Sequence, residues 1–246
     1  MGVVGLFLHP IQAEYLKAHT LGNAKFMITI RNELRNVGYV YMSSYQPNNS
    51  TEQILHSFGT PLSLGMEYAV HQLKPKSKIG STPNTYSGIF GRDKFPLHTD
   101  LAHWRFPPRF LMLRCISGFE AVPTLLLDGV QIIGVGDRST FSRALIRPRR
   151  PIGGALPLLR LYDRQQGDHG MLRWDEVFIC PASQAGEIGV KKFAEHLARS
   201  EPTRILLAKQ GDTLIVDNWR MLHGRAPVPV DCERRVLERA YLENVH

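Results

Sequence analysis

The spacing of apolar residues predicts two helices and a strand in the first part of the chain. Apolar side chains over 27–37 recur every three or four residues, which is the period of one helical face. Gly38 predicts the end of this helix, and the apolar run 39–42 predicts a strand directly after it. Ser50 and Gln53 have the spacing of a capping box, so a second helix is expected to begin there.

The chain changes character from Phe95 onward, where short β-rich runs alternate with turn residues. The runs lie at 110–113, 124–127, 176–179, 204–207, 213–216 and 236–242. One helix interrupts them, because Val190, Phe193 and Leu197 fall on a single apolar face. Many short strands separated by turns are typical of an antiparallel sandwich or barrel. The pattern predicts a mainly β fold with flanking helices around a double-stranded β-helix, or jelly roll, like that of cupins.

Length and pattern together predict the domain organisation. A chain of 246 residues fits one domain with a substantial core. We expect a single domain in which residues 1–60 form a helical and strand decoration. The jelly-roll core is expected over 95–246, with an insertion around 135–200. A connection rich in Gly, Pro, Ser and Asn covers 77–94, and long irregular connections of this kind are often binding loops.

Composition is that of an ordinary globular protein, with 43% hydrophobic and 21% charged residues. No apolar stretch is long enough to span a bilayer, and the short apolar start lacks the features of a signal peptide. The cysteines Cys115, Cys180 and Cys232 have no metal-type spacing, which favours free thiols in a reducing compartment. We therefore expect a cytoplasmic protein with no membrane partner.

The formal net charge is +8, from 30 Lys and Arg against 22 Asp and Glu. Such a charge is compatible with an anionic substrate, with nucleic acid, or with solubility alone, because the total does not tell where charges lie. One local cluster of arginines is interrupted by prolines, which predicts a mobile basic loop rather than a recognition helix. The cluster consists of Arg143, Arg147, Arg149 and Arg150.

The first chemical signal lies in the segment 95–100. His98 and Asp100 are two residues apart, so on a strand both side chains point to the same face, whereas on a helix they diverge. An imidazole and a carboxylate are two of the three ligands of the facial triad that holds iron(II). A His-x-Asp taken alone is usually accidental, and the signal needs a partner elsewhere in the chain.

His223 is the candidate partner. It lies near the end of an apolar strand that a turn opens at Gly211, a position where a histidine can also be a satisfied core residue. It follows His98 by 223 − 98 = 125 residues. The two halves of a jelly roll can bring strands this far apart in sequence together.

A final β-like run carries several arginines. On a strand Arg235, Leu237 and Arg239 share one face, and Arg234 and Val236 share the other. Two arginines aimed inward are costly unless anions meet them. A dicarboxylate supplies such an anion, because guanidinium binds carboxylate in a bidentate fork. The alternative is an edge strand whose arginines are solvated.

In combination these motifs resemble the taurine and chlorophenoxyacetate dioxygenases, and more loosely γ-butyrobetaine hydroxylase. The resemblance runs from about Leu34 to the C-terminus. It is firmest over 95–100, with Pro107 and Pro108 just after, and over 211–239. It implies a non-haem dioxygenase that depends on iron(II), 2-oxoglutarate and dioxygen.

The resemblance implies that His98, Asp100 and His223 bind the iron. Three protein ligands leave three positions on octahedral iron, two for 2-oxoglutarate and one for dioxygen. The retained Asp100 argues against a halogenase, which needs a vacant position for halide. The hard chemistry in such an enzyme belongs to the metal, and the protein orients and shields the reactants.

The same resemblance implies the residues that bind 2-oxoglutarate. Arg235 fits the cosubstrate arginine about a dozen residues beyond the distal histidine, and Arg239 fits a second arginine near substrate or cosubstrate carboxylates. Thr124 matches a threonine that touches 2-oxoglutarate, although Val122-Pro123 replaces the usual Gly-Gly before it. Arg234 takes the role of Arg235 only if the strand register slips by one residue, which would face it the wrong way.

The predicted activity is hydroxylation of an unactivated C–H bond in a small polar or anionic metabolite, with release of succinate and carbon dioxide. An amino acid, an organic acid or a natural-product intermediate would suit. Arg239 indicates an anionic group on this substrate. Tyr86, Lys94 and Trp104 flank the first metal motif and are further candidates for the substrate pocket, though residues of these kinds more often serve packing or lie on the surface.

Two other classes stay open. A nucleic-acid demethylase of the same superfamily would suit the net charge, but its arginine spacing after the distal histidine is longer than here. A non-enzymatic jelly-roll binding protein would have degenerate ligands, and iron-dependent succinate formation distinguishes it from the enzyme. A homo-oligomer is compatible with either.

Overall fold

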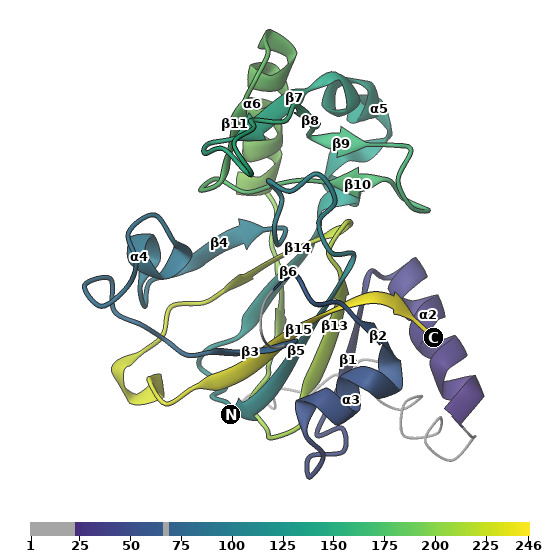
Figure 1. The fold of residues 1–246 in the computed structure, drawn as a ribbon, viewed down its shortest axis with the longest axis vertical. Helices are drawn as coiled ribbons and strands as arrows, with labels where there is room; N and C mark the ends of the chain where they lie inside the picture. Colours follow the sequence, from purple (N-terminus) through teal and green to yellow (C-terminus); the bar gives the residue numbers. More distant parts are fainter. Residues whose placement is uncertain (1–22, 66–68) are drawn as a thin grey trace, which may run out of the picture.

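The structure is a computed structural model that describes residues 23–65 and 69–246. Two antiparallel sheets face each other in its lower half (Figure 1). The larger sheet has the order β1-β13-β5-β15-β2, with β3 also paired to β15. Its strands are β1 (Tyr39–Met42), β2 (Gly59–Pro61), β3 (Val70–Leu73), β5 (Phe110–Ser117), β13 (Thr213–Asp217) and β15 (Val236–Val245).

The smaller sheet has the order β12-β6-β14-β4. Its strands are β4 (Phe95–His98), β6 (Thr124–Asp128), β12 (Thr203–Ile205) and β14 (Met221–Arg225). Buried residues from both sheets, among them Leu113, Leu126 and Leu214, form one apolar cluster between them. Side chains alternate across a strand, so one face of each sheet meets the other sheet. The pair forms the predicted double-stranded β-helix, which confirms the fold class.

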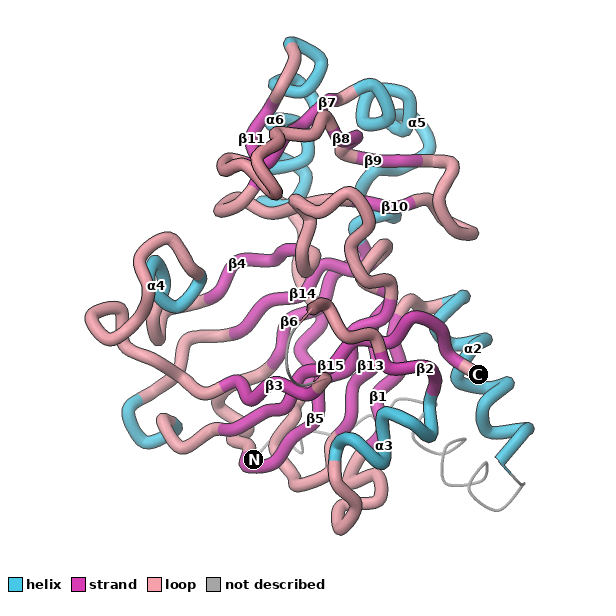
Figure 2. The backbone as a smooth tube through the Cα atoms, viewed as in Figure 1, coloured by secondary structure: helices cyan, strands magenta, loops and turns pink. Residues whose placement is uncertain are grey.

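Helices cover the outer face of the larger sheet (Figure 2). They are α2 (Asn23–Asn36) and α3 (Thr51–Phe58). Ile30 of α2 and Ile54 of α3 are both buried against Met112 and Ile215 of the sheet. The predicted capping box is confirmed, since Ser50 Oγ accepts from the Gln53 amide and Gln53 Oε1 accepts from the Ser50 amide.

A long insertion between β6 and β12 covers the outer face of the smaller sheet, and it forms the upper lobe in Figure 1. Phe141, Trp174 and Phe193 of the insertion pack in one cluster with Leu125 and Leu222 of the sheet. Its elements are α5 (Gly129–Arg143), β7 (Leu145–Pro148), β8 (Leu159–Arg160), β9 (Tyr162–Asp163), β10 (Met171–Leu172), β11 (Ile179–Pro181) and α6 (Gln184–Ala198). Two short helices complete the fold, α4 (Tyr86–Phe90) and the 3₁₀ helix η1 (Val230–Cys232).

The predictions of secondary structure were least accurate in the insertion. The predicted strand at 176–179 is wrong over most of its length, because the Asp175 carboxylate accepts the amides of Val177 and Phe178 and makes a turn. The basic cluster is not simply a loop, since Arg147 lies in β7 and pairs with Cys180 of β11. Helix α5 was not predicted, although the Asp128 carboxylate caps it at two amides.

Two further local predictions are confirmed, whereas the strand expected at 204–207 is present only as β12, which ends at Ile205. The strand expected at 39–42 is β1, and the helix expected around Phe193 is α6. All three cysteines are free thiols, two of them buried. None of the helices within the described ranges is long and apolar enough to cross a membrane.

Candidate active site

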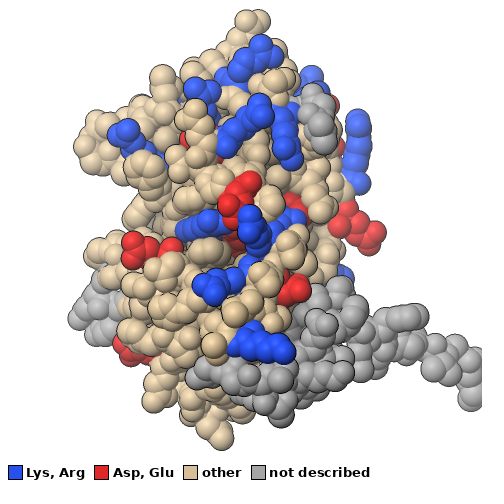
Figure 3. Space-filling view, turned by 90° about the vertical axis from the view of Figure 1, so that its right-hand side faces the viewer, with Lys and Arg blue, Asp and Glu red and all other residues tan. Residues whose placement is uncertain are grey.

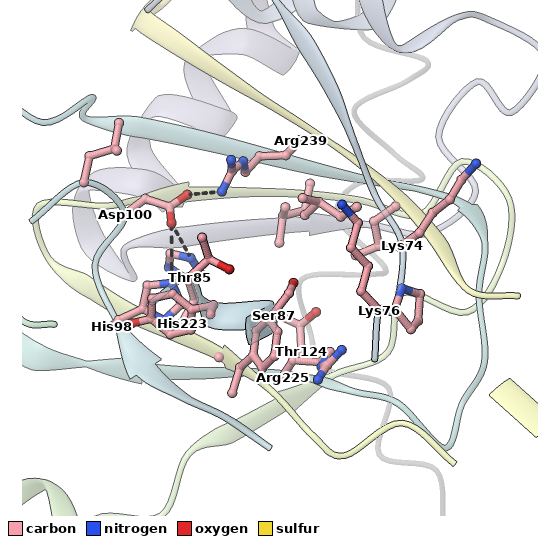
Figure 4. Close-up of a pocket in the computed structure, with 18 of the residues that line it drawn as sticks. Lys74, Lys76, Thr85, Ser87, His98, Asp100, Thr124, His223, Arg225 and Arg239 are labelled. Atoms are coloured by element: carbon pink, nitrogen blue, oxygen red, sulfur yellow. Dashed lines mark hydrogen bonds and ion pairs between the residues drawn. The ribbon is translucent and has the colours of Figure 1, made fainter. Parts of the chain in front are cut away.

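The pairing of β4 with β14 brings the predicted metal ligands together. His98 and His223 are partners in this antiparallel pair, and their ring centroids lie 4.5 Å apart. Asp100 lies two residues beyond His98, the last residue of β4, and its Oδ1 lies 3.4 Å from Nε2 of His98 and 3.5 Å from Nε2 of His223. One ligand atom from each residue therefore lies within 4.8 Å of the other two, and all three residues are buried (Figure 4).

Hydrogen bonds to the backbone fix this arrangement. Nδ1 of His98 lies 2.9 Å from the Pro96 carbonyl, and a proton on Nδ1 leaves the Nε2 lone pair free for a metal. The fully buried Asn218 accepts the Asp100 amide at 2.7 Å and donates to the Asp100 and Pro108 carbonyls. Leu101 then turns the chain with a positive φ of 56°.

The second oxygen of Asp100 has its own partners. Oδ2 accepts a hydrogen bond from the Tyr241 hydroxyl at 2.7 Å and another from Arg239 at 3.3 Å. Burial by itself raises the pKa of Asp100, but the positive charge of Arg239 and the contacts of both histidines hold that pKa well below its usual range. The carboxylate is therefore anionic, with Oδ1 directed toward the imidazoles.

The donor set fits iron(II). Two imidazole nitrogens and one carboxylate oxygen on one side of a cavity form the facial triad of non-haem iron oxygenases and leave the remaining positions open. His98 and Asp100 each make a hydrogen bond on the side away from the metal position, and such bonds orient metal ligands. The buried Nδ1 of His223 has no partner among the described residues.

The triad forms part of the wall of a cavity of about 490 Å³. Arg235 extends into the same cavity and is 5% exposed. No carboxylate among the described residues pairs with its guanidinium, and its Nε has no hydrogen-bond partner there. Burial lowers the pKa of Arg235 to about 10. An uncompensated buried cation of this kind is costly unless an anionic ligand meets it.

Arg225 lies beside Arg235 and was not predicted. Its guanidinium stacks 3.9 Å from the Phe95 ring centroid and donates to two backbone carbonyls. Burial and then the charge of Arg235 lower the pKa of Arg225 to about 10. Thr124 is the strand partner of Arg225, so a hydroxyl and two guanidinium groups share this part of the cavity.

Not every predicted substrate residue lies at this cavity. Tyr86 and Arg239 line it, and the ring centroids of Tyr86 and His98 lie 4.3 Å apart with the rings tilted by 31°. Lys94 is exposed and Trp104 is half-buried, and the structure brings neither to the cavity wall. Arg234 is exposed, as predicted, although it lies in the turn before β15 rather than on the strand.

Two further cavity residues were not predicted, although their spacing along a strand indicated them. Arg225 lies two positions after His223, and Tyr241 lies two positions after Arg239, so alternation along a strand placed both on the inner face. Asp175 also lines the cavity, but it comes from the insertion, where no pattern pointed to it.

The C-terminal part of the chain is similar in sequence to a known enzyme family. A sequence profile of the taurine catabolism dioxygenase TauD, TfdA family matches residues 180–241, which are 62 of the 246 residues. This stretch includes His223, Arg235 and Arg239 but not the first metal motif.

Solved structures share the fold over nearly the whole chain. The non-haem iron oxygenase OrfP, in complex with Fe and α-ketoglutaric acid, is 15% identical, with a TM-score of 0.66 over 96% of this chain and 85% of its own. Asparagine oxygenase, in complex with Fe(II), 3-hydroxyasparagine and succinate, is 14% identical, with a TM-score of 0.64 over 94% and 83%. PvcB from Pseudomonas aeruginosa is 18% identical, with a TM-score of 0.62 over 88% and 79%.

At these identities the structural likeness shows the fold, and the profile match adds a sequence similarity over the C-terminal quarter of the chain. Together they confirm the predicted enzyme class, a non-haem iron oxygenase that depends on 2-oxoglutarate, and the predicted cofactors. Residues 180–241 of this chain are thus similar to the TauD, TfdA family, and the chain as a whole has the fold of these iron oxygenases.

Proposed function

We propose that the protein hydroxylates a C–H bond of a small polar or anionic metabolite and converts 2-oxoglutarate to succinate and carbon dioxide. His98, Asp100 and His223 hold iron(II) in this proposal. The bound metal, with 2-oxoglutarate and dioxygen, supplies the oxidant for the C–H bond. The protein's own residues position 2-oxoglutarate and the substrate next to the metal.

The observation that carries the proposal is the unpaired Arg235 in the same cavity as the triad. A buried guanidinium beside three metal ligands fits a ligand that binds the metal at one end and has a carboxylate at the other. Thr124 and Arg225 add a hydroxyl and a second positive charge near that carboxylate. 2-Oxoglutarate has this shape and charge.

Each residue around the triad has a distinct task. Asn218 fixes the backbone at Asp100, and Tyr241 holds the Asp100 oxygen that faces away from the histidines. Arg239 contacts that same oxygen and also lines the cavity, so it is the candidate for an anionic group of the substrate. The aromatic rings of Tyr86 and Phe178 shield the metal side from water.

The size and charge of the cavity favour a small metabolite. A volume of about 490 Å³ has room for 2-oxoglutarate and a compact second molecule, but not for a folded partner. Lys74 and Lys76 are exposed residues of its lining, as Figure 4 shows. The face drawn in Figure 3 carries acidic side chains among the basic ones, and this mixture does not favour a nucleic-acid ligand.

The test is a screen of pooled metabolites for succinate formed from 2-oxoglutarate by the iron-loaded protein. We expect succinate formation to rise with one pool, to stop on chelation and to be lost in His223→Ala. A binding protein without activity would bind 2-oxoglutarate but form no succinate with any pool. Succinate formed equally by wild type and His223→Ala would contradict the assignment of the metal site.

A further inference from the structure

The cavity wall contains a buried carboxylate that the proposed reaction does not use. Asp175 is 2% exposed and lines the same cavity as the triad. Its neighbour Trp174 accepts the Thr99 amide at 2.8 Å and donates its own amide to Thr99 Oγ1 at 3.1 Å. Since Thr99 lies between His98 and Asp100, these bonds fix Asp175 next to the metal motif.

The contacts of Asp175 do not balance the cost of burying its carboxylate, since burial raises the pKa of Asp175 above its ordinary value. Oδ1 accepts the amides of Val177 and Phe178 at 2.8 and 2.9 Å, and these bonds make the turn that precedes β11. No lysine or arginine among the described residues forms an ion pair with this carboxylate. The charge of a protonated His98 lowers the pKa of this carboxylate, but a metal-bound imidazole is neutral.

Two aromatic rings surround this carboxylate. Tyr86 and Phe178 line the cavity with their ring centroids 5.8 Å apart. Burial, and then the negative charge of Asp175, raise the pKa of Tyr86, so the phenol lies close to the carboxylate. A carboxylate next to aromatic faces is a favourable environment for an organic cation, since the ring quadrupoles add to the ionic attraction.

A purely structural role does not explain the charge. An asparagine would accept the two amides of the turn equally well, without the cost of burying an anion. A buried carboxylate without a basic partner is costly, and a positively charged ligand would offset that cost.

We propose that Asp175, together with Tyr86 and Phe178, binds a primary ammonium or guanidinium group of the substrate. The substrate is then an amine-bearing acid, with its cation at Asp175 and its anionic group at Arg239. This inference rests on the proposed function and names the substrate class of the same site.

The experiment measures ligand binding rather than turnover. The full chain is loaded anaerobically with Mn(II) and 2-oxoglutarate and exposed to two pools. One pool contains amino acids and amines, and the other contains the N-acetylated or deaminated forms of the same compounds. Thermal stabilisation identifies the strongest ligand, and calorimetry gives its Kd. We expect a ligand from the first pool whose N-acetyl form binds at least tenfold more weakly.

The variant Asp175→Asn keeps the turn and removes only the charge. We expect it to bind the same ligand at least tenfold more weakly, with its affinity for 2-oxoglutarate within twofold of wild type. Glu176→Gln is the matched control, because Glu176 is the next residue, is exposed and does not line this cavity. It should bind the ligand as wild type does.

Three results would overturn the inference: a strongest ligand without a cation, no ligand in either pool, or undiminished binding by Asp175→Asn. Each leaves the proposed function intact if the wild type binds 2-oxoglutarate. Failure of the wild type to bind 2-oxoglutarate refutes the proposed function itself, and the inferred substrate class is then refuted as well.

Discussion

The Tyr241 hydroxyl donates to Asp100 Oδ2 at 2.7 Å, while Oδ1 of the same carboxylate faces both histidine Nε2 atoms. Tyr241 is 2% exposed and lies on the inner face of β15. The contact fixes the rotation of the carboxylate and so decides which oxygen meets a metal. Contacts of this kind typically change metal affinity by about ten- to a hundredfold.

Tyr241→Phe should therefore weaken Mn(II) binding about tenfold, because the phenylalanine keeps the packing and loses only the hydrogen bond. Titration calorimetry of the apo protein measures the Kd. Tyr162→Phe is the control, since the Tyr162 hydroxyl bonds the His169 carbonyl in the insertion, away from the cavity. An unchanged Kd in Tyr241→Phe would show that the hydroxyl does not position Asp100.

His98→Ala and His223→Ala should each abolish stoichiometric metal binding and succinate formation. Removing one of three ligands leaves too few donors to hold the ion and changes the open geometry. Metal content after anaerobic loading and desalting is the measurement, with one metal per chain expected for wild type. His103→Ala should retain the metal, because His103 lines the cavity but is not part of the triad.

Asp100→Ala should remove hydroxylation while weak 2-oxoglutarate binding persists. The two histidines remain, but the anionic donor that balances the metal charge is gone. Turnover at the wild-type rate in this variant would mean that the carboxylate ligand lies elsewhere.

Arg235→Ala should weaken 2-oxoglutarate binding roughly ten- to a hundredfold, since a charge-assisted bidentate pair contributes about 1.5–3 kcal/mol. Arg235→Lys should also weaken it, because an ammonium lacks the planar fork. Anaerobic titration of the iron-loaded protein, followed by the charge-transfer band, gives the affinity. Arg234→Ala is the matched control on the exposed side of the chain. A loss in Arg234→Ala but not in Arg235→Ala would reverse the assignment.

Asn218→Ala should lower the free energy of unfolding of the apo protein by about 3 kcal/mol. It leaves the Asp100 amide and two carbonyls without their partner, and each buried unsatisfied group costs about 1–3 kcal/mol. Urea unfolding followed by circular dichroism is the measurement. Asn49→Ala, at an exposed position whose side chain bonds only Gln46, should change stability by less than about 0.5 kcal/mol.

Local patterns in the sequence predicted the metal ligands but not every element that carries them, since His223 lies on β14, in the other sheet from the strand that begins at Thr213. Alternation along a strand predicted Arg235 inward and Arg234 outward. The structure has Arg235 buried and Arg234 exposed, but both precede β15, which begins at Val236, so the turn after η1 sets their directions. The same rule applied to Arg225 and Tyr241 would have found both.

The sequence by itself predicted the types of metal ligand and the inner face of the last strand, because these depend on short spacings that any strand enforces. Tertiary structure decided which distant groups share the cavity. Asp175 reaches the metal side only because the insertion packs on the smaller sheet and Trp174 bonds to Thr99, 75 residues away. Such a contact depends on how two layers dock, and no periodicity along the chain encodes it.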